Sequence, residues 1–363
     1  MTISEWTPET ILRLSGDYWK TCALHAGVKL DVFTIIGDGC LSANEIAGRT
    51  KADLRGVTML LNALTAMNFL IHQEKGYSNS AAGKSFLSKD SDHYLGYMIM
   101  HHHYLMESWS QLDTAVTTGK PLRKRSSQGD AARRESFLMG MFNIAMKVAP
   151  QIVAAVDLSQ RRQLLDLGGG PGTYAIHFCR ANPQLRATVY DLPETRPFAE
   201  KTIAKFGLVD RIAFAEGNFL KEDLPGTYDA ALLSHILHAE GPEDCRKLIR
   251  KAVSVLQPGG LIMIHEFILD NTMDSPLHPA LFALNMLLGT SAGQAYSEEQ
   301  IMDMLTEAHV KDIRRIPVET PNDSGVIIGC VSEQPSPVTA APSRESQASK
   351  NRQKQCSQST DGG

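Results

Sequence analysis

The chain has 363 residues, of which 43% are hydrophobic and 21% charged, and its formal net charge is −4 at pH 7. This length and composition predict a globular protein of two domains, and the slightly acidic balance argues against nucleic acid or an anionic membrane as a partner. The six cysteines are scattered without a C-x-x-C pair, which is typical of reduced thiols in a cytosolic protein. The N-terminus lacks the pattern of a leader and no continuous apolar run reaches membrane-spanning length, so we expect a cytoplasmic protein outside the membrane.

The first part of the chain is predicted to be helical, with one hairpin. Apolar spacing, a capping box and turn residues predict helices at 8–30, 30–36, from 42 and at 53–67, then a hairpin at 69–77. The last three helices and the hairpin make a winged helix, a motif that often binds DNA. The fourth helix has Arg55 as its only cation, however, whereas phosphate contacts need several. Its apolar residues suit burial against a second subunit, so we expect a homodimer and no nucleic-acid partner.

A helix that carries three consecutive histidines, His101 to His103, is expected to continue to residue 115. Consecutive residues point in different directions around a helix, so we interpret them as lining a pocket or an interface rather than as metal ligands. Basic residues over 117–134 predict a solvated loop, followed by a helix at 137–153. The expected divisions are a dimerisation domain at 8–115, a connecting loop and helix at 116–150, a cofactor-binding domain at 151–332 and a disordered tail at 333–363.

The most informative motif is an apolar run that ends in an acid and a glycine cluster. Asp166 is followed by Gly168, Gly169, Gly170 and Gly172, which predicts a buried strand that turns sharply into a helix. The spacing acid-x-G-x-G-x-G differs from the G-x-G-x-x-G of dinucleotide folds, and we interpret it as a site for S-adenosylmethionine (SAM). A glycine-rich turn without a ligand is the alternative.

Acidic and aromatic residues at later strand ends extend this site. A second strand at 186–191 ends in Asp191, where a carboxylate can accept both ribose hydroxyls. Strands then alternate with helices, which predicts a parallel doubly wound sheet closed by an antiparallel edge. Because ligands lie beyond the carboxyl ends of such strands, we expect Asn218 at the polar edge of the adenine, Phe219 against its face, and Ser234 nearby. An asparagine in a turn can instead satisfy the backbone.

His238 follows the strand at 228–233 and is the candidate general base, because imidazole ordinarily titrates near neutral pH. Glu266 ends the neighbouring strand, where it could hold the other ring nitrogen and favour the imidazolium formed on proton transfer. A purely structural histidine is the alternative. His235, His238 and His265 could also bind a metal ion, but no carboxylate cluster suited to Mg²⁺ accompanies them, and we expect no metal.

Together these motifs resemble the SAM-dependent O-methyltransferases of the plant caffeic-acid and animal acetylserotonin type and their bacterial relatives. The resemblance covers about residues 10–332 and rests on Leu105-Met106-Glu107-Ser108-Trp109, the glycine motif from Asp166, Asp191-Leu192-Pro193, Ile236-Leu237-His238, Glu243-Asp244-Cys245 and Pro258-Gly259-Gly260. It implies a Rossmann-like class I methyltransferase domain with a seven-stranded sheet and a winged-helix dimerisation domain. It also implies catalytic roles for His238 and Glu266, a SAM contact at Leu192 and substrate contacts at Phe137, Met141, Phe282, Asn285 and Met286.

Four positions depart from the family pattern and leave the acceptor open. Ala239 stands where the family often has Asp, Ala295 replaces a second supporting acid, and Asn218 and Ser234 replace an Asp and a Lys that contact SAM in plant members. We expect methyl transfer from SAM to a hydroxyl, in the first place a phenolic one, of a small molecule. The alternatives are a thiol or nitrogen acceptor, a SAM-binding winged-helix regulator, and a relative that keeps SAM for a reaction other than methylation.

Overall fold

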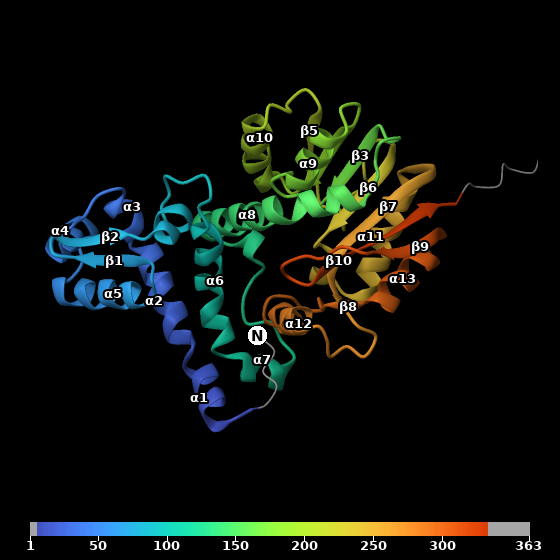
Figure 1. Ribbon diagram of the computed structural model, residues 1–363. Helices are drawn as coiled ribbons and strands as arrows, with labels where there is room; N and C mark the ends of the chain where they lie inside the picture. Colours follow the sequence, from blue (N-terminus) through green and yellow to red (C-terminus); the bar gives the residue numbers. More distant parts are fainter. Residues whose placement is uncertain (1–5, 333–363) are drawn as a thin grey trace, which may run out of the picture.

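The computed structural model describes residues 6–332, so the tail expected at 333–363 lies outside the described residues. A small helical lobe and a larger lobe built on a sheet are joined by one long helix, α8 (Figure 1). The small lobe contains, in chain order, α1 (Pro8–Gly16), α2 (Tyr18–Lys29), α3 (Val32–Ile36), α4 (Ala43–Thr50), α5 (Leu54–Ala66), β1 (Leu70–Gln73), β2 (Gly76–Asn79) and the π-helix η1 (Gly83–Leu87).

The predicted order of helices and hairpin is confirmed, with one correction. The single helix expected at 8–30 is two helices that meet at Asp17, which ends α1 and begins α2. The capping box is present, since the Ser42 hydroxyl accepts the Glu45 backbone N–H at 3.3 Å and the Glu45 carboxylate accepts the Ser42 N–H at 2.8 Å.

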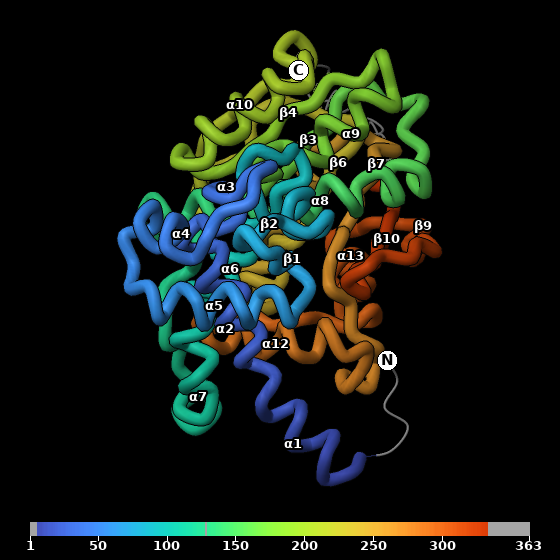
Figure 2. Tube along the Cα trace, turned by 60° about the vertical axis from the view of Figure 1, so that its left-hand side comes forward, coloured from blue at the N-terminus to red at the C-terminus, as the bar shows by residue number. Residues whose placement is uncertain are grey.

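The apolar residues of α5 divide between two environments. Leu61 and Leu64 are buried in the core of their own lobe, whereas Met59 is 55% exposed. Apolar side chains with a greater exposed fraction lie on α1 and α2, including Leu12 and Trp19. Figures 1 and 2 both show α1 projecting from the rest of the molecule. Within this chain, α1 and α2 therefore offer more apolar surface than the helix that we expected at a subunit interface.

The connecting region differs from its prediction at two helix boundaries. It contains α6 (Gly96–Trp109), α7 (Leu112–Thr118), the 3₁₀ turn η2 (Ser126–Gln128) and α8 (Ala131–Ala155). The histidine helix ends at Trp109 rather than at residue 115, and α7 is separate. Asp130 caps α8 by accepting the Arg133 N–H at 2.9 Å, so Arg133 and Arg134 are helical. By length and composition alone α8 could cross a membrane, but it packs against α6, α9 and η2, as a core helix does.

The larger lobe contains an eight-stranded sheet. Its strands are β3 (Gln163–Leu167), β4 (Arg186–Asp191), β5 (Ile212–Glu216), β6 (Tyr228–Ser234), β7 (Leu256–Leu269), β8 (Tyr296–Ser297), β9 (Val310–Ile316) and β10 (Ser324–Val331). Seven follow the order β5-β4-β3-β6-β7-β10-β9, and the short β8, which was not predicted, pairs with the end of β7. Strands β3 to β7 are parallel to one another, and β10 is antiparallel to both of its neighbours, as predicted. Strand β7 is longer than expected, because it includes the turn predicted at 257–260.

Helices cover both faces of this sheet and leave the carboxyl ends of its parallel strands for a site. They are α9 (Thr173–Ala181), α10 (Arg196–Lys205), α11 (Pro242–Ser254), α12 (Leu277–Gly289) and α13 (Glu298–Glu307), with 3₁₀ turns η3 (Pro193–Thr195) and η4 (Leu237–Ala239). One core contains side chains of α8, α9 and α10, and the other those of α11 and α13. Helix α12 instead contacts α6, α7, η4 and β7, so it joins the connecting region to the strand ends.

Candidate functional site

The glycine loop between β3 and α9 has the backbone that its sequence predicted. Gly168, Gly170 and Gly172 all have positive φ, a backbone conformation that residues other than glycine rarely adopt. A Cβ at Gly169 would lie 2.6 Å from the Asp166 carboxyl carbon, so this position has no room for a side chain. A Cβ at Gly170 would instead meet open space. The loop thus presents backbone to a ligand while it packs closely on the acid beneath.

Two carboxylates support this loop. Asp191, at the end of β4, accepts the Gly170 N–H at 2.8 Å and the Leu192 N–H at 2.7 Å, which joins the two strand ends. Asp166 is fully buried and accepts the Ala175 N–H at 3.2 Å through Oδ2, while its Oδ1 has no hydrogen-bond partner among the described residues. Burial raises the pKa of Asp166 to about 7, and burial also raises the pKa of Asp191.

The three other predicted cofactor residues differ in their surroundings. Asn218 accepts the Leu220 N–H at 3.0 Å, so its side chain caps its own turn. Phe219 is half-buried and packs against the core cluster that contains α11. The Ser234 hydroxyl lies 2.9 Å from His265 Nδ1, and its partner is therefore a neighbouring strand. All three follow or end strands of the parallel sheet, but Asn218 and Ser234 already have protein partners.

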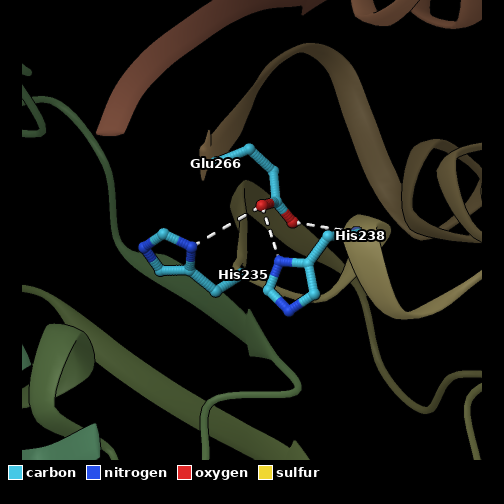
Figure 3. Close-up of side chains that lie close together, drawn as sticks. All are labelled: His235, His238 and Glu266. Atoms are coloured by element: carbon cyan, nitrogen blue, oxygen red, sulfur yellow. Dashed lines mark hydrogen bonds and ion pairs between the residues drawn. The ribbon is translucent and has the colours of Figure 1, made fainter. Parts of the chain in front are cut away.

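His238 and Glu266 lie together as predicted, and His235 shares the same carboxylate (Figure 3). His238 Nδ1 is 2.8 Å from Glu266 Oε2, and the His238 backbone N–H donates to Glu266 Oε1 at 3.2 Å. His235 Nδ1 lies 3.6 Å from Oε2. His235 has a φ of 56°, a left-handed backbone that costs a residue other than glycine about 1 kcal/mol or more. The turn after β6 therefore brings two imidazoles to one buried acid.

The charge on Glu266 is maintained by these histidines. Glu266 is only 2% exposed, and burial alone would raise its pKa. Positive charge on His238 and His235 and the hydrogen bond from His238 outweigh burial and lower the pKa of Glu266 below its usual value. Because Glu266 holds Nδ1 of His238, the Nε2 nitrogen is left for another group. A carboxylate in this position can also stabilise the imidazolium that would form on proton transfer.

The possible metal ligands differ from the predicted trio. Atoms of His235, His238 and Glu266 lie within 4.8 Å of one another, an arrangement that could hold a metal ion. His265 does not belong to this group, because its two ring nitrogens lie 2.9 Å from Ser234 Oγ and 3.0 Å from Ser324 Oγ. It is fully buried, and burial lowers the pKa of His265 well below its usual value, so it stays neutral.

Of the residues expected to face a substrate, Phe282 lies beside His238, and the others lie on α8 and α12. The Phe282 ring, on α12, lies 4.8 Å from the His238 ring and 4.5 Å from the Phe267 ring. The Phe137 ring, on α8, lies 5.3 Å from the His101 ring. The Asn285 side chain accepts the Trp109 indole N–H at 3.3 Å. The two methionines lie on the same helices, Met141 half-buried on α8 and Met286 buried on α12.

Sequence reasoning missed two arginines in the segment that we expected to be a solvated loop. Arg123 Nη2 donates to the Asn285 side chain at 2.9 Å, and Arg125 Nη2 donates to the Ala239 carbonyl at 2.7 Å and to Glu240 at 2.9 Å. The expectation of solvation is therefore wrong for both. Nothing local distinguishes these arginines from their exposed neighbour Lys124; the only signal was the frequency of basic residues before the substrate-facing helix.

The loop and its acids fit SAM. The buried Asp166 oxygen that lacks a partner and the open space at Gly170 are features that a ligand beside the loop would explain. SAM carries positive charge on its sulfonium and amino groups, which suits a site with two nearby acids. Asp191, at the end of β4, is in the position from which a carboxylate accepts ribose hydroxyls.

Comparisons with known proteins identify the family. The chain matches the O-methyltransferase domain over residues 110–310 and the O-methyltransferase dimerisation domain over residues 12–89. It is 33% identical to 3-hydroxy-5-methyl-1-naphthoate 3-O-methyltransferase from Streptomyces sahachiroi, over 89% of this chain and 95% of the relative. It is 31% identical to the tetracenomycin polyketide synthesis 8-O-methyl transferase TcmO from Streptomyces glaucescens, over 87% and 95%. A solved structure of the Serratia protein PigF with SAH is 27% identical and superimposes with a TM-score of 0.81, over 90% of this chain and all of the other. The chain therefore belongs to the O-methyltransferase family, and it is a SAM-dependent methyltransferase with an N-terminal dimerisation domain.

Proposed function

We propose that this enzyme transfers a methyl group from SAM to a phenolic hydroxyl of a small aromatic molecule, with His238 as the general base. The observation that carries the proposal is the 2.8 Å contact between His238 Nδ1 and Glu266 Oε2, which leaves Nε2 to take a proton. SAM, when bound, supplies the activated methyl group. Asp166, Asp191 and the glycine loop would hold it, as their geometry and charge suit a cationic ligand.

Glu266 has two tasks in this proposal. It fixes the His238 ring by accepting both Nδ1–H and the backbone N–H of the same residue, so the ring and the turn that carries it move together. Its negative charge also favours the protonated imidazole, which makes proton removal from the acceptor easier. A positioned base of this kind typically contributes about 10²–10⁴-fold to the rate.

An aromatic acceptor is supported by the rings beside the base. Phe267 and Phe282 lie 4.5 Å apart, and Phe282 lies 4.8 Å from His238 in an edge-to-face orientation. Aromatic rings prefer such packing, so a further ring has suitable neighbours here. The Streptomyces sahachiroi relative is named for the 3-hydroxyl of a naphthoate, which is an aromatic hydroxyl.

The test is His238→Ala, assayed with labelled SAM and phenolic acceptors. We expect kcat to fall by about 10²–10⁴-fold at neutral pH, while SAM affinity measured by calorimetry stays the same, because a base acts on turnover. Raising the pH should recover part of the loss, since a phenol with a pKa near 10 ionises in solution. His93→Ala is the control, because His93 is exposed and lies outside the site.

His235→Ala tests whether the second histidine is the base instead. If His238→Ala keeps the parent rate and His235→Ala does not, the assignment of the base is wrong. If thiols or amines are methylated and phenols are not, the acceptor class is wrong although the enzyme class stands. Duplex DNA binding without turnover would indicate a regulator, and SAM binding without release of S-adenosylhomocysteine (SAH) would indicate a different reaction.

We also propose a cytoplasmic homodimer formed through the winged helix and the two helices before it. Exposed apolar side chains on α1 and α2 support this, since contiguous apolar surface of this kind usually marks an interface. The domain limits proposed here are 8–115 for dimerisation, 116–150 for the connection and 151–332 for SAM binding. Helix α8 runs across the limit at residue 150, so the connection and the SAM-binding part share one helix.

A further inference from the structure

Arg123 is a largely buried cation without an acidic partner. It forms no ion pair within residues 6–332, and burial lowers the pKa of its guanidinium. Its neighbour Arg125 is also partly buried, but Arg125 binds the carboxylate of Glu240 through both Nη1 and Nη2. Buried charges are ordinarily paired, because removing a charge from water without compensation is costly. Arg123 is therefore the exception that needs an explanation.

The Arg123 side chain is held in one place. Its Nη2 donates to the Asn285 carbonyl at 3.1 Å and to Asn285 Oδ1 at 2.9 Å, and Oδ1 also accepts the Trp109 indole N–H. The backbone N–H groups of Leu122 and Arg123 both donate to the Leu288 carbonyl. A Cβ at position 289 would lie 2.6 Å from Arg123 Nη1, so Gly289 leaves space for the guanidinium. Nε has no hydrogen-bond partner among the described residues, and none of their acceptors binds Nη1.

Arg123 lines a cavity of about 370 Å³ between α6, the segment that follows α7, and the start of α8. The cavity is the size of a small organic ligand. His101 lines it too, but burial lowers the pKa of His101 to about 3, so this imidazole is neutral. Asp130 is exposed and pairs with Arg133 at 3.5 Å. Glu107, Lys124 and Arg133 also line the cavity but are exposed, whereas the guanidinium of Arg123 is a largely buried positive charge on its wall.

The cavity wall is tied to the catalytic region. Asn285 lies one helical turn from Phe282 on α12, and Phe282 contacts His238. Arg125, two residues from Arg123, donates to the carbonyl of Ala239, which follows the base. Phe137, on α8, contacts His101, which lines the cavity. Helix α12 contacts both α6 and α7, and Figures 1 and 2 show these helices beside one another.

We propose that Arg123 binds a carboxylate substituent of the methyl acceptor, so that the preferred acceptors are aromatic hydroxy acids. A carboxylate would supply the missing charge and accept an N–H of Nη1, which lacks a partner among the described residues, and hydrogen bonds between charged groups are about twice as strong as neutral ones. This inference rests on the proposed function, because it requires the acceptor to reach from His238 to the Arg123 guanidinium.

A binding experiment tests the inference without relying on turnover. Calorimetry with the full chain saturated with SAH would compare 1-naphthoate and 2-naphthoate with the matching naphthamides, which have the same shape but no charge. We expect at least one naphthoate to bind the parent enzyme tenfold or more tightly than its amide. Arg123→Gln, which removes the charge, should abolish that preference, and Arg123→Lys should retain part of it. Equal affinity for acid and amide, or no measurable binding of either, would overturn the inference.

Turnover supplies a second readout that distinguishes recognition from a structural role. With hydroxynaphthoic acids and their carboxamides, Arg123→Gln should lower kcat/KM for the acid by about 30–100-fold, mostly through KM, and change that for the amide less than threefold. A parallel loss for both acceptors would mean that Arg123 merely holds α12 in place. Arg55→Gln, an exposed arginine on α5, controls for net charge. If phenols are methylated but the acid is not preferred, this inference fails alone; if no phenol is methylated, the proposed function fails.

Discussion

Glu266→Gln separates the electrostatic role of the buried acid from its role as a hydrogen-bond acceptor. Oε2 of Glu266 accepts from His238 Nδ1 at 2.8 Å and from the Phe267 N–H at 3.2 Å, whereas Oε1 accepts from the His238 backbone N–H alone. The glutamine that disturbs fewest bonds places its oxygen at the Oε2 position. Its amide nitrogen then faces the His238 backbone N–H. Two hydrogen-bond donors thus point at each other in a buried site, and neither has an acceptor there.

The expected loss follows from the charge that is removed. Two unit charges about 4 Å apart at an effective dielectric constant of about 20 interact by about 4 kcal/mol, which is an upper limit for the stabilisation of the His238 imidazolium. Since about 1.4 kcal/mol corresponds to a tenfold change in rate, we expect kcat to fall by about 10²–10³-fold. The flipped glutamine would donate to Nδ1 instead, which leaves the proton on Nε2 and removes the base altogether.

The assay is steady-state turnover of a phenolic acceptor at saturating SAM, with calorimetry of SAM binding and a thermal melt alongside. SAM affinity should stay within a fewfold of the parent, because Glu266 contacts the base rather than the glycine loop. Glu298→Gln is the control, since Glu298 pairs with Arg315 at a partly exposed position away from His238. A Glu266→Gln enzyme that melts like the parent and keeps its kcat would refute the reasoning, because the carboxylate would then have no part in turnover.

Three further perturbations have definite expected outcomes. Asp191→Ala should weaken SAM binding by about 1–3 kcal/mol, the cost of leaving buried polar groups unpaired, and calorimetry that shows unchanged affinity would remove Asp191 from the site. Burial raises the pKa of Asp166 to about 7, so the folded protein keeps a proton that the unfolded chain releases near pH 4. Stability without ligand should therefore decline as the pH rises from about 4 through 7, by up to about 4 kcal/mol, and denaturation of Asp166→Asn should show a flatter profile. Trp19, on α2, is 70% exposed, so light scattering should find a dimer for the parent and a monomer for Trp19→Glu, whereas a monomeric parent would contradict the proposed interface.

The parts of the site that the sequence could predict are those governed by backbone rules. Glycines with positive φ, an acid at the end of β4 and a histidine after β6 each follow a strand of the same parallel sheet. Because parallel strands end at one edge, side chains that are far apart in the sequence meet there. The contact between His238 and Glu266 was predictable for this reason, since β6 and β7 are neighbours in register.

Contacts outside that rule could not be predicted. The role of His265 depends on Ser324, which reaches it from the antiparallel strand β10, and no spacing in the sequence marks that pair. The break between α1 and α2 falls at Asp17, where neither proline nor a glycine with positive φ marks it. The basic segment before α8 has the composition of a solvated loop. Arg123 is nevertheless largely buried, because it donates to Asn285 on α12, more than 150 residues later in the chain.

The strand ends and the segments outside the sheet therefore differ in what their sequences reveal about the reaction and about the acceptor. The strand ends, whose sequences match the family, carry the groups that we propose for SAM binding and for proton transfer, and their geometry follows from the sheet. The acceptor side that we propose combines α8, α12 and the segment around Arg123, which are far apart in the sequence and come together through tertiary contacts. A change in one of these segments can alter the charge or shape presented to the acceptor while leaving the base and its carboxylate in place. The family motifs therefore identify the reaction, whereas the acceptor must be inferred from side chains such as Arg123 that no motif contains.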